Sequence, residues 1–340
     1  MNAKRNINIE TLRTMAVFSV ILIHMAVPVF HSKEVMNSDI SLWLVSNLYY
    51  TISRFCVPIF FIIATYIAFN SLSKNMGFLS RIKRIGVPYV FWSTLYYIFN
   101  GGDDVFNLIK LTLTKYTSVH LWFLPAFLGF VLFLPAVKKI LDNDSLRELR
   151  YLPILVFLFS VVLPSTTHFL NTFIGDFSYL NGLNQFELNL PAYIAYALVF
   201  PYVYRKVNAV YYTFIFFFIV FVNAALNVLV SLKTGVPNEY YYQYTTPLVF
   251  ISSYVLFNVF MSINLDAVYT PVKNLIYSIG MNSFGIYLVH WMVFMVLKRN
   301  NLIFEQISVT GPIANTLLVM AISFFIVMII RRIKFANYFL

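Results

Sequence analysis

Long apolar segments alternate with short polar breaks along the whole chain. Most apolar segments have roughly 16 to 25 residues, the length that a helix needs to span a hydrocarbon core of about 30 Å. The longest breaks, at about 101–118, 169–188 and 232–245, are expected to be short loops. The segments predict ten helices, at residues 11–30, 41–71, 85–100, 119–137, 152–168, 189–204, 209–231, 246–263, 275–297 and 313–331.

The pattern predicts an all-α, polytopic membrane protein, with residues 1–340 in a single transmembrane domain and no appended soluble domain. Segment 41–71 is too long for a straight crossing and contains Pro58, which predicts a tilted or kinked helix. The first segment contains Arg13 and His24 and lacks a small-residue cleavage site near Pro28. It is therefore expected to remain as a span rather than to be removed as a signal peptide.

The composition supports this class and excludes several others. Hydrophobic residues make up 60% of the chain and charged residues 11%, and the mean hydropathy is +0.76, whereas soluble proteins carry about 25% charged residues. Nucleic-acid binding, a secreted disulfide scaffold and a soluble dinucleotide-binding enzyme are thereby excluded. Cys56 is the only cysteine, so no intrachain disulfide can form.

The net charge of +11 matters less in a membrane protein than the position of each charge. With the N-terminus inside, sixteen basic residues fall in inner segments and six in outer ones, which favours two cytoplasmic termini and an even number of spans. The inner residues are Lys4, Arg5, Lys74, Arg81, Lys83, Arg84, Lys138, Lys139, Arg147, Arg150, Arg205, Lys206, Lys273, Arg331, Arg332 and Lys334. The outer residues are Lys33, Lys110, Lys115, Lys233, Lys298 and Arg299.

Ionisable side chains inside a membrane span are costly and are therefore candidates for function. Arg13 and His24 lie eleven residues apart, which places them on one face of a helix and about 16 Å apart along its axis. Glu10 precedes Arg13 by three residues, a spacing that allows an ion pair on that face. An arginine that reaches the headgroups and a histidine that packs between helices would explain the same pattern equally well.

Other polar side chains in the predicted helices have both structural and functional interpretations. Arg54 shares a stripe with Asn47 and Tyr50, and it would either line a path for an acceptor or pair with a neighbouring helix. Hydrogen bonding between helices is the favoured interpretation of a second stripe, Ser283, Tyr287 and His290. Polar contacts between helices are also expected of Asn223 and Asn227.

For residues near predicted helix ends, a structural interpretation is preferred to a functional one. His120 and Trp122 lie near the outer end of the fourth helix, where a belt of aromatic residues is expected, although Trp122 could also stack on a sugar. His31 and His168 lie near outer helix ends and receive no role. The five histidines are too scattered in the sequence to predict a metal site.

Five sequence motifs follow one another along the chain. They are Glu10, Arg13 and His24 on the first helix, then residues 53–61, residues 81–84 with 87–89, residues 120–123 and residues 283–290. In this order they resemble the membrane-bound acyltransferase 3 family, most closely its short members that O-acetylate bacterial surface glycans such as the enterobacterial common antigen. The chain departs from the family at Ala64-Thr65-Tyr66, where Ser-Gly-Tyr is usual.

The resemblance implies a multi-pass O-acetyltransferase of the bacterial cytoplasmic (inner) membrane. Its donor co-substrate would be cytoplasmic acetyl-CoA, and its acceptor a hydroxyl of a surface polysaccharide or of its lipid-linked precursor. His24 would be the general base, with Arg13 and Glu10 completing the catalytic set. The donor phosphates would be bound by Arg81, Lys83, Arg84 and Arg13. The candidates for acceptor binding are Arg54, His120, Trp122, Tyr287 and His290.

Two rival interpretations stand beside this one. A transporter or flippase for a glycan or a lipid-linked sugar would also line its path with buried Arg, His and Asn, but the sequence has no inverted repeat. A membrane scaffold would not depend on His24 or Arg13. Without the resemblance, the basic residues of loop 81–84 would be explained by the preference of lysine and arginine for cytoplasmic loops.

The predicted orientation places the donor site at the cytoplasmic face. Membrane-impermeant analogues of CoA should therefore inhibit acyl transfer in inside-out vesicles and leave it unchanged in right-side-out vesicles. The measurement is the transfer of labelled acetyl groups in both preparations at the same analogue concentration. Equal inhibition from both faces would overturn the orientation.

Overall fold

The computed structural model describes residues 6–70, 77–142, 149, 151–186 and 192–340. These residues form helices and turns and no strand, which confirms the predicted all-α fold. The α-helices are α1 (Ile7–Phe30), α2 (Lys33–Ser38), α3 (Ile40–Ile52), α4 (Cys56–Asn70), α5 (Phe78–Phe99), α6 (Val105–Thr114), α7 (Phe123–Asp142), α8 (Leu152–Phe157), α9 (Leu163–Phe173), α10 (Ile194–Val203), α11 (Ala209–Thr234), α12 (Pro247–Ser262), α13 (Thr270–Arg299) and α14 (Gly311–Ile330). Tighter or wider helical turns are η1 (Val119–Trp122), η3 (Leu158–Val162), η4 (Ser178–Phe186), η5 (Tyr240–Tyr242) and η6 (Lys334–Phe339).

Eight helical segments of the described chain are long and apolar enough to cross a membrane. They coincide with eight of the ten predicted spans, and they are Ile7–Phe30, Ile40–Asn70, Val119–Asp142, Leu152–Phe173, Ala209–Thr234, Tyr240–Ser262, Thr270–Arg299 and Gly311–Ile330. The predicted span 85–100 corresponds to α5, whose first two turns carry three basic residues. The predicted span 189–204 corresponds to α10, which has only ten residues. The number of crossings and the orientation of the termini stay predictions.

Some predicted positions lie outside the described residues. They include five of the basic residues that were assigned to the inner face, Lys4, Arg5, Lys74, Arg147 and Arg150. They also include position 71 at the end of one predicted helix and positions 189–191 at the start of another.

All three segments that were predicted to be loops contain helical structure. The end of α11 and the whole of η5 lie within 232–245. α6 lies within 101–118, and both the end of α9 and the whole of η4 lie within 169–188. The carboxylate of Asp104 begins α6 by accepting hydrogen bonds from two backbone N–H groups, and no residue of the helix is buried. A surface helix of ten residues is too short to appear as a span in a hydropathy pattern, which explains why it was missed.

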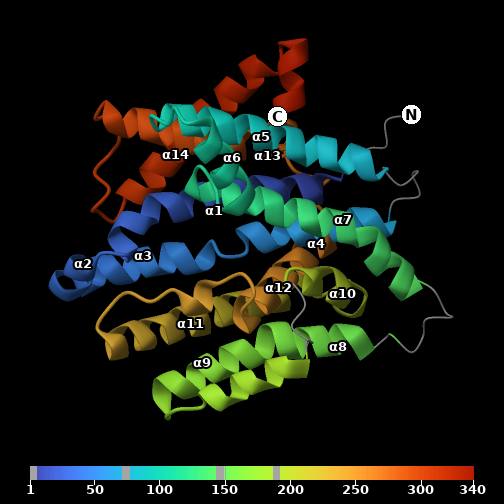
Figure 1. The fold of residues 1–340 in the computed structure, drawn as a ribbon, viewed down its shortest axis with the longest axis vertical. Coiled ribbons are helices and arrows are strands. Elements are labelled where there is room, and N and C mark those ends of the chain that lie inside the picture. The colour runs from blue at the N-terminus through green and yellow to red at the C-terminus, as the bar shows by residue number, and fades with distance from the viewer. Residues whose placement is uncertain (1–5, 71–76, 143–148, 150, 187–191) are drawn as a thin grey trace.

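α1 is the central helix of the bundle (Figure 1). It packs against α3 and α4 on one side and against α13 and α14 on the other. Leu12 and Ile21, which point in opposite directions from the helix axis, are both fully buried. A helix that is surrounded by protein can carry polar side chains that contact with lipid would not tolerate.

The long second segment is broken, as its length and Pro58 predicted. α3 ends at Ile52, and a turn at residues 53–55 separates it from α4. Pro58 lies in the first turn of α4, and in a continuous helix its ring would clash with the backbone carbonyl of Arg54. The break places Arg54 inside the bundle, where its side chain is buried.

Gly280 allows α1 and α13 to approach closely. A Cβ atom at this position would lie 2.6 Å from the backbone oxygen of Glu10 and 2.9 Å from its Cβ. Four residues beyond Glu10 along α1, the Thr14 hydroxyl donates a hydrogen bond to the backbone oxygen of Ile276 at 3.3 Å. The absent side chain of Gly280 therefore lets the first turns of α1 pack directly on α13.

Replacing Gly280 by alanine should destabilise the protein by about 1–3 kcal/mol, because the new methyl group must push the backbone of α1 away. The measurement is the thermal unfolding midpoint of the detergent-purified protein. The matched control is Gly129→Ala in α7, where a new Cβ meets no atom within 4 Å and the midpoint should stay or rise. Equal midpoints in the two variants would contradict the close packing at Gly280.

Candidate active site

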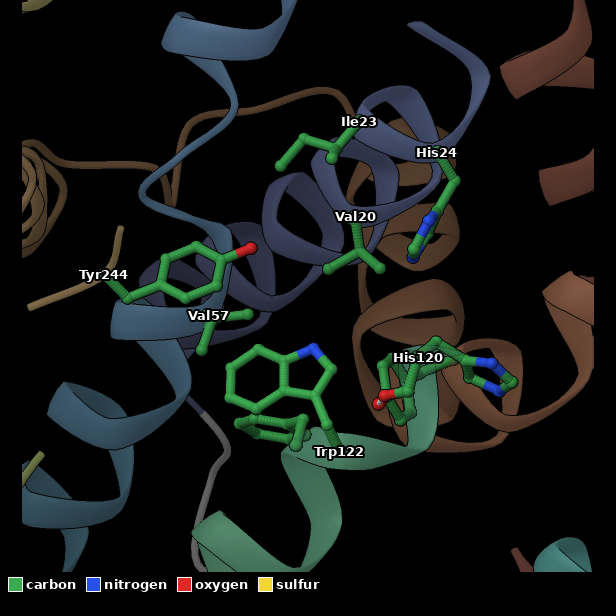
Figure 2. Close-up of a pocket in the computed structure, with 9 residues that line it drawn as sticks. Val20, Ile23, His24, Val57, His120, Trp122 and Tyr244 are labelled. Atoms are coloured by element: carbon green, nitrogen blue, oxygen red, sulfur yellow. Dashed lines mark hydrogen bonds between the residues drawn. The ribbon is translucent and has the colours of Figure 1, made fainter. Parts of the chain in front are cut away.

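A small cavity lies inside the bundle beside α1 (Figure 2). Its volume of about 40 Å³ leaves room for a few water molecules. Residues of α1, α4, η1, α7 and α13 and of the segment before α12 line it, namely Val20, Ile23, His24, Val57, His120, Trp122, Phe123, Tyr244 and Tyr287. Because these elements are far apart in the sequence, the cavity forms only when the bundle is assembled.

His24 faces the cavity from α1 (Figure 2). The centroid of its ring lies 5.4 Å from that of His290 and 5.1 Å from that of Trp291. The side chain is partly buried, and within the described part of the chain no protein group hydrogen-bonds to its ring nitrogens. An imidazole nitrogen is therefore available to a molecule that enters the cavity.

Two more histidines belong to this region, since His290 lies next to His24 and His120 lies next to His290. The rings of His120 and His290 are 5.1 Å apart, and both Nε2 atoms are buried without a hydrogen bond from the described residues. His290 Nδ1 donates to the backbone oxygen of Tyr287 at 2.5 Å, so Nε2 is the basic atom of the neutral ring. His120 Nδ1 lies 3.1 Å from the Ser118 hydroxyl, and the backbone oxygen of His120 accepts a hydrogen bond from the Tyr287 hydroxyl. Residue spacing did not predict this cluster of three histidines.

Trp122 and Tyr244 form another wall of the cavity as a stacked pair (Figure 2). Their ring centroids are 5.7 Å apart, and the ring planes differ by 16°. His120 is 1% exposed, so it lies inside the protein as well. The interpretation of His120 and Trp122 as residues of a lipid-facing aromatic belt is therefore wrong. They belong to η1, a short turn that directs them to the cavity before α7 begins.

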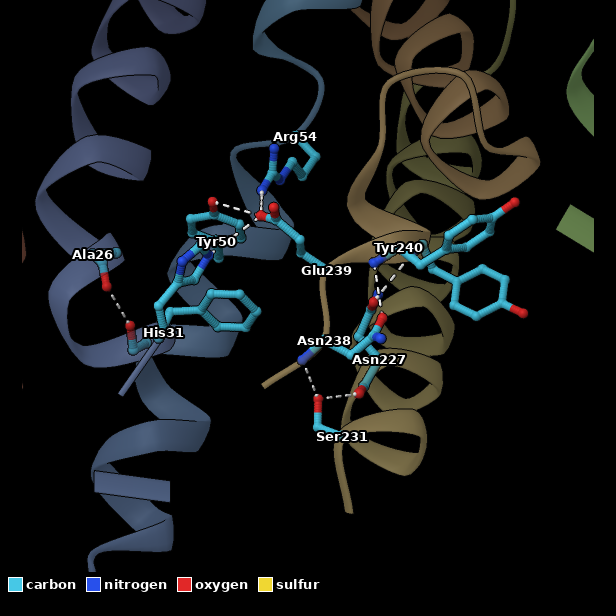
Figure 3. A network of polar contacts seen from close by, with 12 residues as sticks. Ala26, His31, Tyr50, Arg54, Asn227, Ser231, Asn238, Glu239 and Tyr240 are labelled. Atoms are coloured by element: carbon cyan, nitrogen blue, oxygen red, sulfur yellow. Dashed lines mark hydrogen bonds and ion pairs between the residues drawn. The ribbon is translucent and has the colours of Figure 1, made fainter. Parts of the chain in front are cut away.

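Arg54 forms a second polar cluster with Glu239 (Figure 3). Its Nη2 atom lies 3.5 Å from Glu239 Oε2, and its guanidinium stacks on the ring of Tyr50 at 3.9 Å. The same carboxylate oxygen accepts a hydrogen bond from the Tyr50 hydroxyl at 3.1 Å and lies 3.3 Å from His31 Nε2. His31, to which no role was assigned from the sequence, belongs to this cluster.

The segment after α11 folds back along that helix and carries Glu239 with it (Figure 3). The backbone N–H of Asn238 donates to the Ser231 hydroxyl at 2.9 Å, and that of Tyr241 donates to Asn227 Oδ1 at 3.2 Å. The polar face of α11, which was expected to contact another helix, thus holds this returning segment. The hydrogen bonds fix the backbone on both sides of Glu239.

Sequence reasoning missed Glu239 as a site residue. The residue stands in a predicted loop, and its pairing with Arg54 joins positions that are 185 residues apart. The one available signal is a single carboxylate directly before residues 240–244, four of which are tyrosines. No spacing rule connects such a loop to the second helix.

Glu10 and Arg13 form the predicted ion pair near the start of α1. Arg13 Nη1 lies 3.0 Å from Glu10 Oε1, and the Glu10 side chain is buried. Neither residue lines the cavity, and Arg13 lies about 16 Å from His24 along the helix. The structure therefore does not bring Glu10 and Arg13 into contact with His24.

Residues 6–332 match the family model of an acyltransferase domain. The chain belongs to the acyltransferase 3 family. The match includes every residue of the cavity and of the Arg54–Glu239 cluster, so both lie within the acyltransferase domain. Neither the curated proteins nor the solved structures that were compared gave a match.

Three of the four predicted donor-binding residues of the acyltransferase lie in the first two turns of α5, and the fourth, Arg13, lies in α1. Arg81 Nη1 donates a hydrogen bond to the backbone oxygen of Val131 at 3.1 Å and so links α5 to α7. Lys83 and Arg84 are exposed, and in the described part of the chain neither forms an ion pair. Two of the three cations are thus available to an anionic ligand.

Glu239 lies outside the membrane-spanning segments, and its pKa is lowered from the usual 4.5 to about 2. The hydrogen bond with His31 is the largest cause, and the charge of Arg54 contributes. Because the pKa is lower in the folded protein, the ionised carboxylate stabilises the acyltransferase fully above pH 4.5, and this stabilisation is lost as the pH falls towards 2.

The Glu239→Gln variant should therefore unfold at a lower temperature than the unmodified acyltransferase above pH 4.5, and the difference should shrink between pH 4.5 and 2. Unfolding midpoints of both detergent-purified proteins, measured side by side across this range, provide the check. A difference that does not change with pH would contradict the ionised pairing of Glu239.

Proposed function

We propose that this acyltransferase is an O-acetyltransferase of the bacterial cytoplasmic membrane. It transfers an acetyl group from cytoplasmic acetyl-CoA to a hydroxyl of a cell-surface polysaccharide or of its lipid-linked precursor. The observation that carries the proposal is an imidazole, His24, that faces a cavity inside the bundle without a hydrogen bond from the described residues. An acyltransferase needs a base at the point where its donor and acceptor meet.

The donor is a polyanion, and its phosphates and adenosine stay at the inner surface. Lys83 and Arg84 offer exposed cations there, and Arg81 lies in the same turns of α5. Guanidinium groups bind phosphate through two parallel hydrogen bonds. Arg13, oriented by its ion pair with Glu10, adds a positive charge at the predicted inner end of α1. The pantetheine arm then carries the thioester along α1 towards His24.

His24 acts as the general base of the transfer. Its neutral ring takes the proton of the acceptor hydroxyl while the hydroxyl oxygen attacks the thioester carbonyl. The carbon–sulfur bond then breaks, the acetyl group remains on the acceptor as an ester, and the proton passes to the sulfur of CoA. His290 lies against the ring of His24 and limits its rotation.

The acceptor enters from the opposite side of the membrane. Trp122 lies on the cavity, where its ring face can pack against the apolar face of a sugar. Tyr287 and His120 fix one another through the hydroxyl-to-carbonyl hydrogen bond and complete that wall. The buried Arg54 lies outward of this wall and holds the Glu239 carboxylate.

Replacing His24 by glutamine should lower acetyl transfer at saturating acetyl-CoA by on the order of a hundredfold or more, because the side chain keeps its polarity and loses its titratable nitrogen. Binding of acetyl-CoA should persist, since the proposed phosphate contacts lie at the other end of α1. The measurements are transfer and CoA binding on the same purified preparation.

The matched control is His168→Gln, which changes a histidine of α9 away from the cavity and should leave transfer unchanged. Turnover of the His24→Gln protein near that of the unmodified enzyme would show that His24 only packs or positions. His290 would then become the candidate base.

A further inference from the structure

The two oxygens of the Glu239 carboxylate have different surroundings. All its described side-chain contacts are made through Oε2, with Tyr50, His31 and Arg54 at 3.1, 3.3 and 3.5 Å. Within the described part of the chain, Oε1 has no hydrogen-bond partner. The side chain is 51% exposed, so the carboxylate can be reached from outside the protein. One oxygen is anchored, and the other is a free acceptor of hydrogen bonds.

The anchored carboxylate lies in line with the cavity. His31, which caps the C-terminal end of α1, follows His24 by seven residues, which puts the two on one side of the helix axis and roughly 10 Å apart along it. Tyr244 connects the two places, because its ring lines the cavity and lies 5.5 Å from the guanidinium of Arg54. Contacts through Arg54 and Tyr244 therefore connect Glu239 with the wall of the cavity.

The surroundings of Glu239 favour uncharged hydrogen-bond donors as its ligand. Arg54 already neutralises the carboxylate, and the guanidinium is covered by protein, so no free positive charge is left to attract an anion. Carboxylate oxygens accept strong hydrogen bonds from hydroxyl groups. The stacked rings of Trp122 and Tyr244 add apolar surface to the wall of the cavity, and Tyr244 lies beside Arg54. A fixed carboxylate beside flat aromatic rings suits a neutral sugar, which offers hydroxyl groups at its rim and an apolar ring face.

We propose that Glu239 is an acceptor-binding residue whose Oε1 atom accepts hydrogen bonds from hydroxyl groups of a neutral saccharide. The bound sugar unit lies outward of the hydroxyl that is acylated at His24, so the acceptor is longer than a single sugar. Tyr50, His31 and Arg54 are positioning residues that hold the carboxylate through its other oxygen. This inference rests on the proposed function and adds the recognition of the acceptor.

The test uses the full-length purified protein with Glu239→Ala and Glu239→Gln, and Glu34→Gln as the control that removes an exposed carboxylate of α2. The probe is the oligosaccharide released from the surface polysaccharide of host cells that lack this gene. The KM for the oligosaccharide should rise about tenfold or more in Glu239→Ala and less in Glu239→Gln, which keeps an oxygen acceptor. The KM for acetyl-CoA should not change in either variant. An unchanged value would also show that the donor site is correctly folded.

A purely structural role for Glu239 predicts another result. It would lower kcat or the unfolding midpoint and leave the KM for the oligosaccharide unchanged, and that outcome would overturn the inference. Binding of the same oligosaccharide, followed by tryptophan fluorescence without acetyl-CoA, separates the two proposals. If the protein binds the oligosaccharide in a Glu239-dependent manner and transfers no acetyl group, the proposed function is wrong and the proposed binding site is supported. If transfer occurs and neither variant weakens binding, the proposed binding site is wrong and the proposed function is supported.

Discussion

Inside a bilayer the protein itself must provide the partners of every polar side chain, because lipid offers none. This constraint governs α1, which carries Arg13 and His24 on one face and is capped on the same face by His31, at spacings of eleven and seven residues. The ion pair with Glu10 satisfies Arg13, and Glu239 satisfies His31. His24 alone among the three has no hydrogen bond from the described residues, and it is the one that faces the cavity. A ligand in the cavity would supply the partner that His24 lacks, which is the role proposed for the acceptor hydroxyl.

The same constraint applies to Arg54, which the break in the second helix places inside the bundle. Pro58 prevents a continuous helix past residue 54, and the resulting turn at residues 53–55 directs the side chain of Arg54 into the bundle. A buried guanidinium without an anion would cost several kcal/mol, so the segment after α11 must deliver Glu239 to it. The hydrogen bonds from residues 238 and 241 to the polar face of α11 fix that segment. A kink, a buried charge and a returning loop are therefore one structural unit, in which each part requires the others.

The sequence allowed much of the fold to be predicted and less of the site. Apolar runs identified the spans because hydropathy is a local property, and the Glu10–Arg13 pair followed from its spacing on one helix. The contact of His24 with His290, and that of Arg54 with Glu239, join residues far apart in the sequence and depend on how helices pack. His120 and Trp122 were misplaced because helix ends are ambiguous, and a short turn such as η1 decides which way their side chains face.

The size of the cavity bears on how an acyltransferase of this kind would avoid hydrolysing its donor. Water competes with the acceptor hydroxyl for the same base, and a wide aqueous site would favour hydrolysis because water is abundant. A cavity of about 40 Å³, with aromatic and aliphatic side chains on most of its wall, holds few water molecules beside His24. An acceptor held by Glu239, as proposed, would gain a high effective concentration at the proposed base, which bulk water could not match in so small a volume. In the proposed mechanism, selectivity for transfer over hydrolysis would follow from where the acceptor is held and would not require a more reactive base.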